Sequence, residues 1–156
     1  ADVPVIVDAR DPLLKCVIEA HPQAITPNLD ELQDCVGATL TVPEGVICAA
    51  RKLVSEGIGT VVCTLGKRGA IFATSSSGIW MSSAPSVDAL SPVGCGDALV
   101  AGLAHATVDG SCIQTRMRWA VAAGSAAATA LTATLDDRTT VEELLTQVKL
   151  EDIDSP

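Results

Sequence analysis

Aromatic residues are scarce in this sequence, which has no tyrosine, one phenylalanine and two tryptophans. Alanine, valine and leucine must therefore fill the interior, and such small side chains suit helices packed closely on a sheet. Basic residues are also few, since 10 Lys and Arg stand against 19 Asp and Glu, for a formal net charge of −9. We therefore do not expect a protein that binds nucleic acids or anionic membranes.

The sequence also lacks an uncharged apolar run long enough for a transmembrane helix, and from its first residues we expect no signal peptide. Its 6 cysteines, at positions 16, 35, 48, 63, 95 and 112, form no CxxC motif. We interpret them as reduced core residues of a cytoplasmic protein, because neither a disulfide framework nor a zinc site fits this spacing. The lone histidines His21 and His105 are interpreted as helix-end or surface residues.

Short apolar runs alternate with amphipathic segments along the chain, which predicts one α/β domain with a mainly parallel sheet. Residues 4–8 are expected to form a strand buried on both faces. Asp11 is expected to cap the first helix, with Leu13 among the residues that face inward. The other predicted strands are 24–26, 60–65, a hairpin of 70–74 with 78–81, and a last strand or tail at 148–153. The other predicted helices begin near Asn28, Val42, Ala98, Cys112 and Thr140.

A glycine turn leads directly into an apolar helix in the stretch Ser91-Pro-Val-Gly-Cys-Gly-Asp-Ala-Leu-Val-Ala-Gly-Leu-Ala104. Gly94 and Gly96 allow backbone angles that a β-carbon would forbid. A helix that begins at such a turn presents unpaired N–H groups and the positive end of its dipole, which together make an anion site. Asp97 makes sense there if it takes a proton from a group about to receive a phosphoryl. The alternative is that Asp97 only satisfies amides of the first turn.

Two further motifs follow predicted strands. In Thr26-Pro-Asn-Leu-Asp-Glu-Leu32, Asn28 and Glu31 stand three residues apart and can lie on one face of a helix. On local sequence alone a capping box is the favoured interpretation. In Thr64-Leu-Gly-Lys-Arg-Gly-Ala70, two glycines would let the backbone approach a ligand at a strand's carboxyl end. The alternative is an ordinary turn with two solvated cations.

The segment Gly94-Cys-Gly-Asp97, with Ser91-Pro-Val before it, resembles the signature of the ribokinase-like sugar kinases, the phosphofructokinase B family. The other two motifs resemble that family's Asn-x-x-Glu and Thr-Leu-Gly-x-x-Gly motifs. The likeness is greatest to the phosphosugar branch, which includes 1-phosphofructokinase and tagatose-6-phosphate kinase. Cys95 departs from the usual alanine or serine and is interpreted as a tolerated variant, the alternative being a reactive thiol.

The resemblance implies a three-layer α/β/α sandwich, of which residues 1–156 would be a single nucleotide-binding and catalytic domain fragment, the C-terminal portion. The resemblance implies that Asp97 is the catalytic base and that the anion hole consists of Gly94, Cys95 and Gly96. It implies that the nucleotide is bound by a loop with Thr64, Gly66, Lys67 and Gly69, and that adenine lies beside Ala123 and Gly124. It also implies that Mg²⁺ is bound by Asn28 and Glu31, through water or phosphate. For Ala123 and Gly124, helix packing is the default alternative.

The same resemblance implies a reaction, partners and a location. The expected partners are ATP, Mg²⁺ and a sugar phosphate, in a cytoplasmic enzyme. The N-terminal half, which in the family carries most sugar contacts and the lid, is expected to be missing here. Because the lid in such kinases often mediates dimers, the resemblance also implies a possible homodimer of the whole enzyme. Ser91 stands where some members have an aspartate for a monovalent cation, which puts that cation in doubt. The alternative function is a catalytically silent nucleotide-binding fragment or module.

Overall fold

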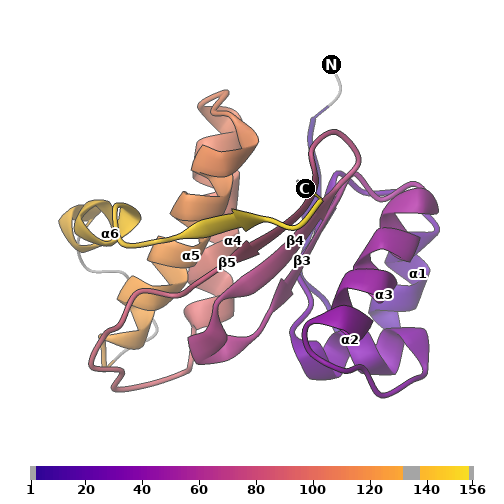
Figure 1. The fold of residues 1–156 in the computed structure, drawn as a ribbon, viewed down its shortest axis with the longest axis horizontal. Coiled ribbons are helices and arrows are strands. Elements are labelled where there is room, and N and C mark those ends of the chain that lie inside the picture. Colours follow the sequence, from indigo (N-terminus) through magenta and orange to yellow (C-terminus); the bar gives the residue numbers. More distant parts are fainter. Residues whose placement is uncertain (1–2, 132–137, 155–156) are drawn as a thin grey trace. The chain divides into compact units, whose positions relative to one another are not determined.

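A computed structural model describes residues 3–131 and 138–154 of the chain (Figure 1). The described strands are β1 (Ile6–Val7), β2 (Ala24–Ile25), β3 (Thr60–Thr64), β4 (Ala70–Thr74), β5 (Gly78–Ser82) and β6 (Leu150–Asp152). The described helices are α1 (Leu13–Ile18), α2 (Leu29–Val36), α3 (Glu44–Ser55), α4 (Cys95–Val108), α5 (Ile113–Ala128) and α6 (Arg138–Leu145), with a 3₁₀ turn, η1 (Gly66–Arg68).

The strands form one sheet in the order β1-β2-β3-β4-β5-β6. The pairs β1–β2 and β2–β3 are parallel, with Ile6 opposite Ala24 and Ile25 opposite Val61. Three residues join β4 to β5, as a hairpin requires, so the parallel part of the sheet is its first half. The α/β class predicted from the alternation of strands and helices is confirmed.

The described residues divide into two compact units. The first contains residues 3–65, 71–81 and 152–154, and the second contains residues 66–70, 82–131 and 138–151. In the first unit α1, α2 and α3 lie on one side of the strands (Figure 1). Their apolar faces and the strands share one buried cluster that includes Leu14, Ile25, Leu32, Val46, Leu53 and Val61. This cluster holds the carboxyl ends of the parallel strands at one edge of the unit.

Three expectations about the first unit are wrong. The first strand is not buried on both faces, because β1 lies at the edge of the sheet, with Ile6 and Val7 half-buried and Val5 53% exposed. Asp11 does not cap α1, since Pro12 occupies the N-cap and no side chain of the residues described caps this helix. Leu13 does not face inward, since it is 64% exposed in the first turn of that helix.

In the second unit α4 packs along α5, and α5 packs against α6. Gly102 allows α4 to approach α5 closely, because a β-carbon at this position would meet the Trp119 carbonyl oxygen and lie 2.9 Å from Ala123 Cβ. The Trp119 ring also meets the edge of His105, at 4.7 Å between centroids, and the Arg138 guanidinium, at 5.2 Å from the ring centroid. Small side chains therefore bring the helices together, as the alanine-rich composition predicts.

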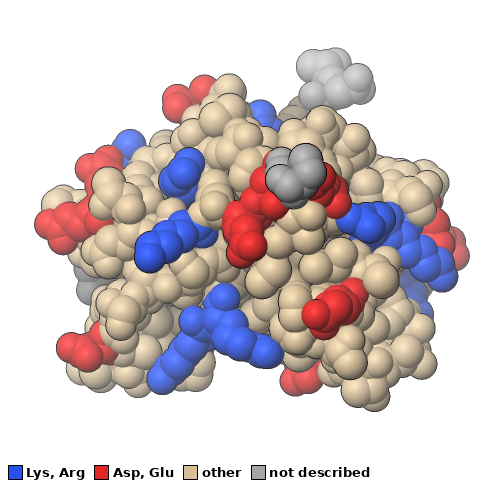
Figure 2. Space-filling view, viewed as in Figure 1, with Lys and Arg blue, Asp and Glu red and all other residues tan. Residues whose placement is uncertain are grey.

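The cysteines are all unpaired, but they are not all core residues. Cys63 is buried in β3, whereas Cys16, Cys48 and Cys112 are exposed, which corrects the expectation that the cysteines fill the core. His21 and His105 are exposed, as expected. On the face drawn in Figure 2, acidic and basic side chains are dispersed among uncharged residues. Among the helices described, none has the length and apolar character needed to span a membrane.

Candidate functional site

The turn before α4 has the predicted geometry at Gly94 but not at Gly96. Gly94 is the N-cap residue and has φ = 82°, a left-handed conformation that favours glycine. Its carbonyl accepts a hydrogen bond from the Ala98 N–H at 2.9 Å, which begins the helix. Gly96 differs from the expectation: it lies inside α4 without a positive φ, and a β-carbon there would meet open space.

In the first turn of α4, two backbone N–H groups and one carboxylate have no hydrogen-bond partner among the described residues. Within the described residues, the N–H groups of Gly96 and Asp97 have no hydrogen-bond acceptor, and no side chain caps the helix. Asp97 lies in this turn, is exposed, and forms no hydrogen bond or ion pair in the same part of the chain. Asp97 therefore does not serve as the cap that the alternative interpretation requires. In the part of the chain that the structure describes, an exposed carboxylate therefore lies in the same turn as amides without an acceptor.

The Cys95 thiol is not an activated nucleophile. Its Sγ donates to the Ser91 carbonyl oxygen at 3.6 Å. Burial raises the pKa of the Cys95 thiol above its ordinary value, although a backbone hydrogen bond acts in the opposite direction. A thiol in this state is mostly protonated at neutral pH, so the structure favours Cys95 as a small residue tolerated by the turn.

Ala123 and Gly124 lie on α5, on the side that meets α4. Ala123 is 2% exposed, and its side chain packs at the position of Gly102. Gly124 is partly exposed, and a β-carbon there would lie 3.1 Å from the Cys95 carbonyl oxygen. Helix packing thus accounts for both small residues, and the contact with adenine stays a prediction.

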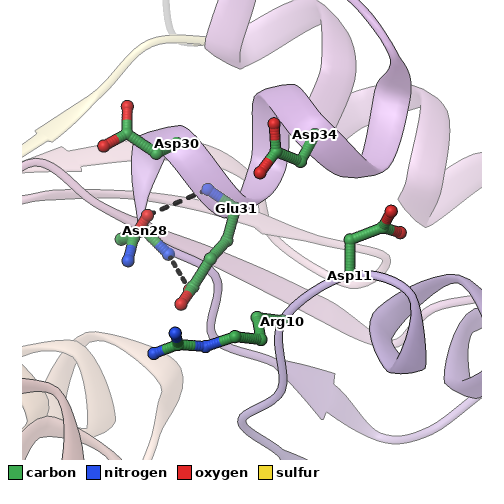
Figure 3. A pocket seen from close by; sticks show the side chains of 6 residues that line it. All are labelled: Arg10, Asp11, Asn28, Asp30, Glu31 and Asp34. Carbon is green, nitrogen blue, oxygen red and sulfur yellow. Dashed lines mark hydrogen bonds between the residues drawn. The ribbon is translucent and has the colours of Figure 1, made fainter.

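Asn28 and Glu31 form a complete capping box at the start of α2 (Figure 3). The Glu31 N–H donates to Asn28 Oδ1 at 2.9 Å, and the Asn28 N–H donates to Glu31 Oε2 at 3.0 Å. The local sequence predicts this cap, and the cap also fixes the direction of the glutamate. Within the described residues, Glu31 Oε1 and the Asn28 side-chain amide form no further hydrogen bond, so they can still bind a ligand.

Thr64 lies beside this box. It ends β3, forms an isolated parallel bridge with Asn28, and donates its N–H to the Pro27 carbonyl oxygen at 3.0 Å. Asn28 itself follows β2, so two neighbouring parallel strands bring these side chains to the same edge. This is the edge where α/β proteins gather their ligands.

Gly66, Lys67 and Gly69 form the turn that follows Thr64. Gly66 and Lys67 are exposed in η1, whereas Gly69 is buried and has φ = 92°. A β-carbon on Gly69 would overlap the Ser82 carbonyl oxygen, so the close approach of the chain to itself accounts for this glycine. Contact of Gly66 and Lys67 with a nucleotide remains a prediction.

A pocket of about 260 Å³ opens next to the capping box, lined by Arg10, Asp11, Asn28, Asp30, Glu31 and Asp34 (Figure 3). Among the described residues, no group of at least three His, Cys, Asp or Glu side chains could hold a metal ion. Oxygen ligands suit Mg²⁺, and Asn28 and Glu31 offer them, so the residues fit an ion that keeps its waters or is held by phosphate. Sequence reasoning missed Arg10, because only the fold places it beside this box.

The predicted site residues divide between the two units. Asn28, Glu31 and Thr64 belong to the first, and the structure brings these three together. The anion-hole residues, Asp97, Ala123 and Gly124 belong to the second, where Gly124 lies against the start of α4.

Residues 1–140 match the family model described as pfkB family carbohydrate kinase. The chain belongs to this family of sugar kinases, as its motifs predict.

Among its relatives is a 1-phosphofructokinase of Borreliella burgdorferi, 31% identical over 152 residues, with 97% of this chain and 49% of the relative aligned. The crystal structure of a putative phosphofructokinase from Staphylococcus aureus is 32% identical and superposes with a TM-score of 0.86 over 97% of this chain and 48% of that one. A ribokinase from Thermotoga maritima, 24% identical, has the same fold, with a TM-score of 0.79 over 94% of this chain and 50% of its own. The chain thus spans about half the length of these proteins.

Proposed function

We propose that this chain is the nucleotide-binding and catalytic part of an ATP-dependent phosphosugar kinase. The reaction would transfer the γ-phosphoryl of ATP to a hydroxyl of a hexose phosphate. The observation that carries the proposal is the first turn of α4, where Asp97 is exposed and unpaired beside the free amides of Gly96 and Asp97 within the described chain. An enzyme that transfers phosphoryl groups needs these two elements, a base and a place for negative charge.

The proposed chemistry assigns one task to each group. The Asp97 carboxylate takes the proton of the sugar hydroxyl as that oxygen bonds to the γ-phosphorus and the bond to the β–γ bridging oxygen breaks. The amides at the start of α4 stabilise charge on the phosphoryl oxygens, aided by the positive end of the helix dipole. Mg²⁺ would neutralise part of the phosphate charge. Asn28 and Glu31 would orient that ion through water or phosphate, and Thr64 would contact the nucleotide.

The relatives suggest which acceptor to try first. The curated relative from B. burgdorferi is named 1-phosphofructokinase, so fructose 1-phosphate is the first substrate to test, and tagatose 6-phosphate is the second. Both offer a primary hydroxyl, and the residues discussed above do not discriminate between them.

A second candidate function is a nucleotide-binding module without turnover. The span of about half of the relatives' length favours it, because residues that close a sugar site need not all lie in this chain. MgATP calorimetry together with a kinase assay separates the two functions. Binding without turnover of any hexose phosphate would support the module and contradict the kinase.

Replacing Asp97 by asparagine tests the proposed base. The amide keeps the size of the side chain but cannot accept the proton, so we expect kcat to fall about 10²-fold to 10⁴-fold while the Kd for MgATP stays the same. Asp109→Asn is the matched control, because Asp109 is an exposed aspartate at the other end of α4. An Asp97→Asn enzyme that keeps most of its kcat would refute the assignment.

A further inference from the structure

Arg10 lies at the same sheet edge as the capping box, although no motif includes it. It follows β1, as Asn28 follows β2, and these two strands are parallel neighbours. Their carboxyl ends therefore lie side by side, and Arg10, Asn28 and Glu31 line one pocket. In Figure 3 the Arg10 side chain extends along the side of the pocket where Asn28 and Glu31 lie, away from Asp11 and Asp34.

The Arg10 guanidinium has no partner among the described residues, although the pocket that it lines is acidic. The other charged residues that line it are the carboxylates of Asp11, Asp30, Glu31 and Asp34. Nevertheless, Arg10 forms no hydrogen bond through its side chain and no ion pair within 4.0 Å among the residues that the structure describes. Asp11 pairs instead with Lys15, at 3.1 Å. The donors of Arg10 are thus left for a group that the described residues do not supply.

We infer that Arg10 binds phosphate oxygens of the ligand that occupies this pocket. A planar guanidinium donates two parallel hydrogen bonds to a phosphate, which a single ammonium does not. A phosphate entering a pocket of carboxylates also needs positive charge beside it, and Arg10 provides this charge together with any Mg²⁺ that the phosphate brings. This inference rests on the proposed function, and it adds a phosphate-binding residue that the family-like motifs do not contain.

The phosphate has two sources in the proposed reaction, the nucleotide and the hexose phosphate. Isothermal titration calorimetry of the full chain with MgATP, MgADP and fructose 1-phosphate distinguishes them. We expect Arg10→Gln to weaken binding of one class of ligand at least about tenfold, the cost of losing a charge-assisted hydrogen bond. Loss confined to MgATP and MgADP assigns Arg10 to the nucleotide, and loss confined to fructose 1-phosphate assigns it to the sugar phosphate.

Two further variants control for charge and for stability. Arg10→Lys keeps the charge without the planar fork, so we expect it to restore only part of the affinity. Arg51→Gln removes the same charge from α3, in the same unit but outside the pocket, and we expect it to bind all three ligands as the unmodified chain does. Urea unfolding of each variant verifies that the fold is intact, which the exposure of both arginines favours.

The outcomes separate this inference from the proposed function. If the unmodified chain binds MgATP and Arg10→Gln binds every ligand equally well, the role of Arg10 is refuted and the proposed kinase stands. If Arg51→Gln weakens binding as much as Arg10→Gln does, the effect is general electrostatics, and the assignment to Arg10 is likewise refuted. If the unmodified chain binds neither nucleotide nor fructose 1-phosphate, the proposed function and the inference both fail.

Discussion

Replacing Glu31 by glutamine separates the structural role of the capping box from its predicted role toward magnesium. The glutamine oxygen can still accept the Asn28 N–H, now 3.0 Å from Glu31 Oε2, and Asn28 Oδ1 still accepts the N–H of residue 31, at 2.9 Å. Capping boxes tolerate glutamine at this position. The stability cost is the loss of a negative charge near the start of α2, about 0.3–1 kcal/mol. The fold should therefore survive the change.

The expected loss of Mg²⁺ binding free energy in Glu31→Gln is larger than this loss of stability. A unit charge about 4 Å from a carboxylate is stabilised by about 1 kcal/mol in water and by about 4 kcal/mol at an effective dielectric constant of 20. Glu31 is only partly buried, so the lower value applies, and it doubles for a divalent ion. A loss of about 2 kcal/mol corresponds to about a 30-fold higher Mg²⁺ concentration for half-maximal effect.

The assay is a titration with free Mg²⁺ at fixed ATP, followed both by nucleotide binding and by phosphoryl transfer to fructose 1-phosphate. Glu44→Gln is the matched control, because Glu44 is also a glutamate in the first turn of a helix of the same unit, α3, and does not line the pocket. We expect the control titration to coincide with that of the unmodified chain. If the Glu31→Gln curve coincides with it too, Glu31 is only a cap and the magnesium role is refuted.

Two further predictions concern stability. Gly102→Ala would push a β-carbon into the Trp119 carbonyl oxygen, so we expect the free energy of unfolding in urea to fall by about 1–3 kcal/mol. The control is Gly96→Ala, whose β-carbon meets open space and should not lower that free energy. Equal losses in the two variants would contradict the packing of α4 on α5. Burial raises the pKa of Cys63 from 9.0 to about 12, so only the unfolded chain loses this proton near pH 9. Stability should therefore decline as pH rises from about 9 toward 12, by at most about 1.4 kcal/mol per pH unit, and Cys63→Ala should remove that part of the slope; an identical slope in the variant would contradict the shift.

Two features that depend on neighbouring residues were predictable from the sequence, although the cap expected at Asp11 was not. The cap at Asn28 and Glu31 involves groups three residues apart, and the turn at Gly94 needs only the left-handed preference of one residue. Exposure was less predictable. Leu13 has the apolar character of a core residue but lies 64% exposed, because the packing of α1 on its unit, and not its own sequence, sets which face is covered.

The sequence by itself determined the α/β class, the cap at Asn28, the turn at Gly94, the acid at the start of α4 and the family, because each depends on residues a few positions apart. Only the tertiary structure decided which strand lies at the sheet edge, which cysteines are buried and which glycine faces Trp119. It also placed Thr64 and Arg10 beside Asn28. Those properties arise when segments distant in the sequence pack together, and side-chain type alone does not specify the partner that a residue meets.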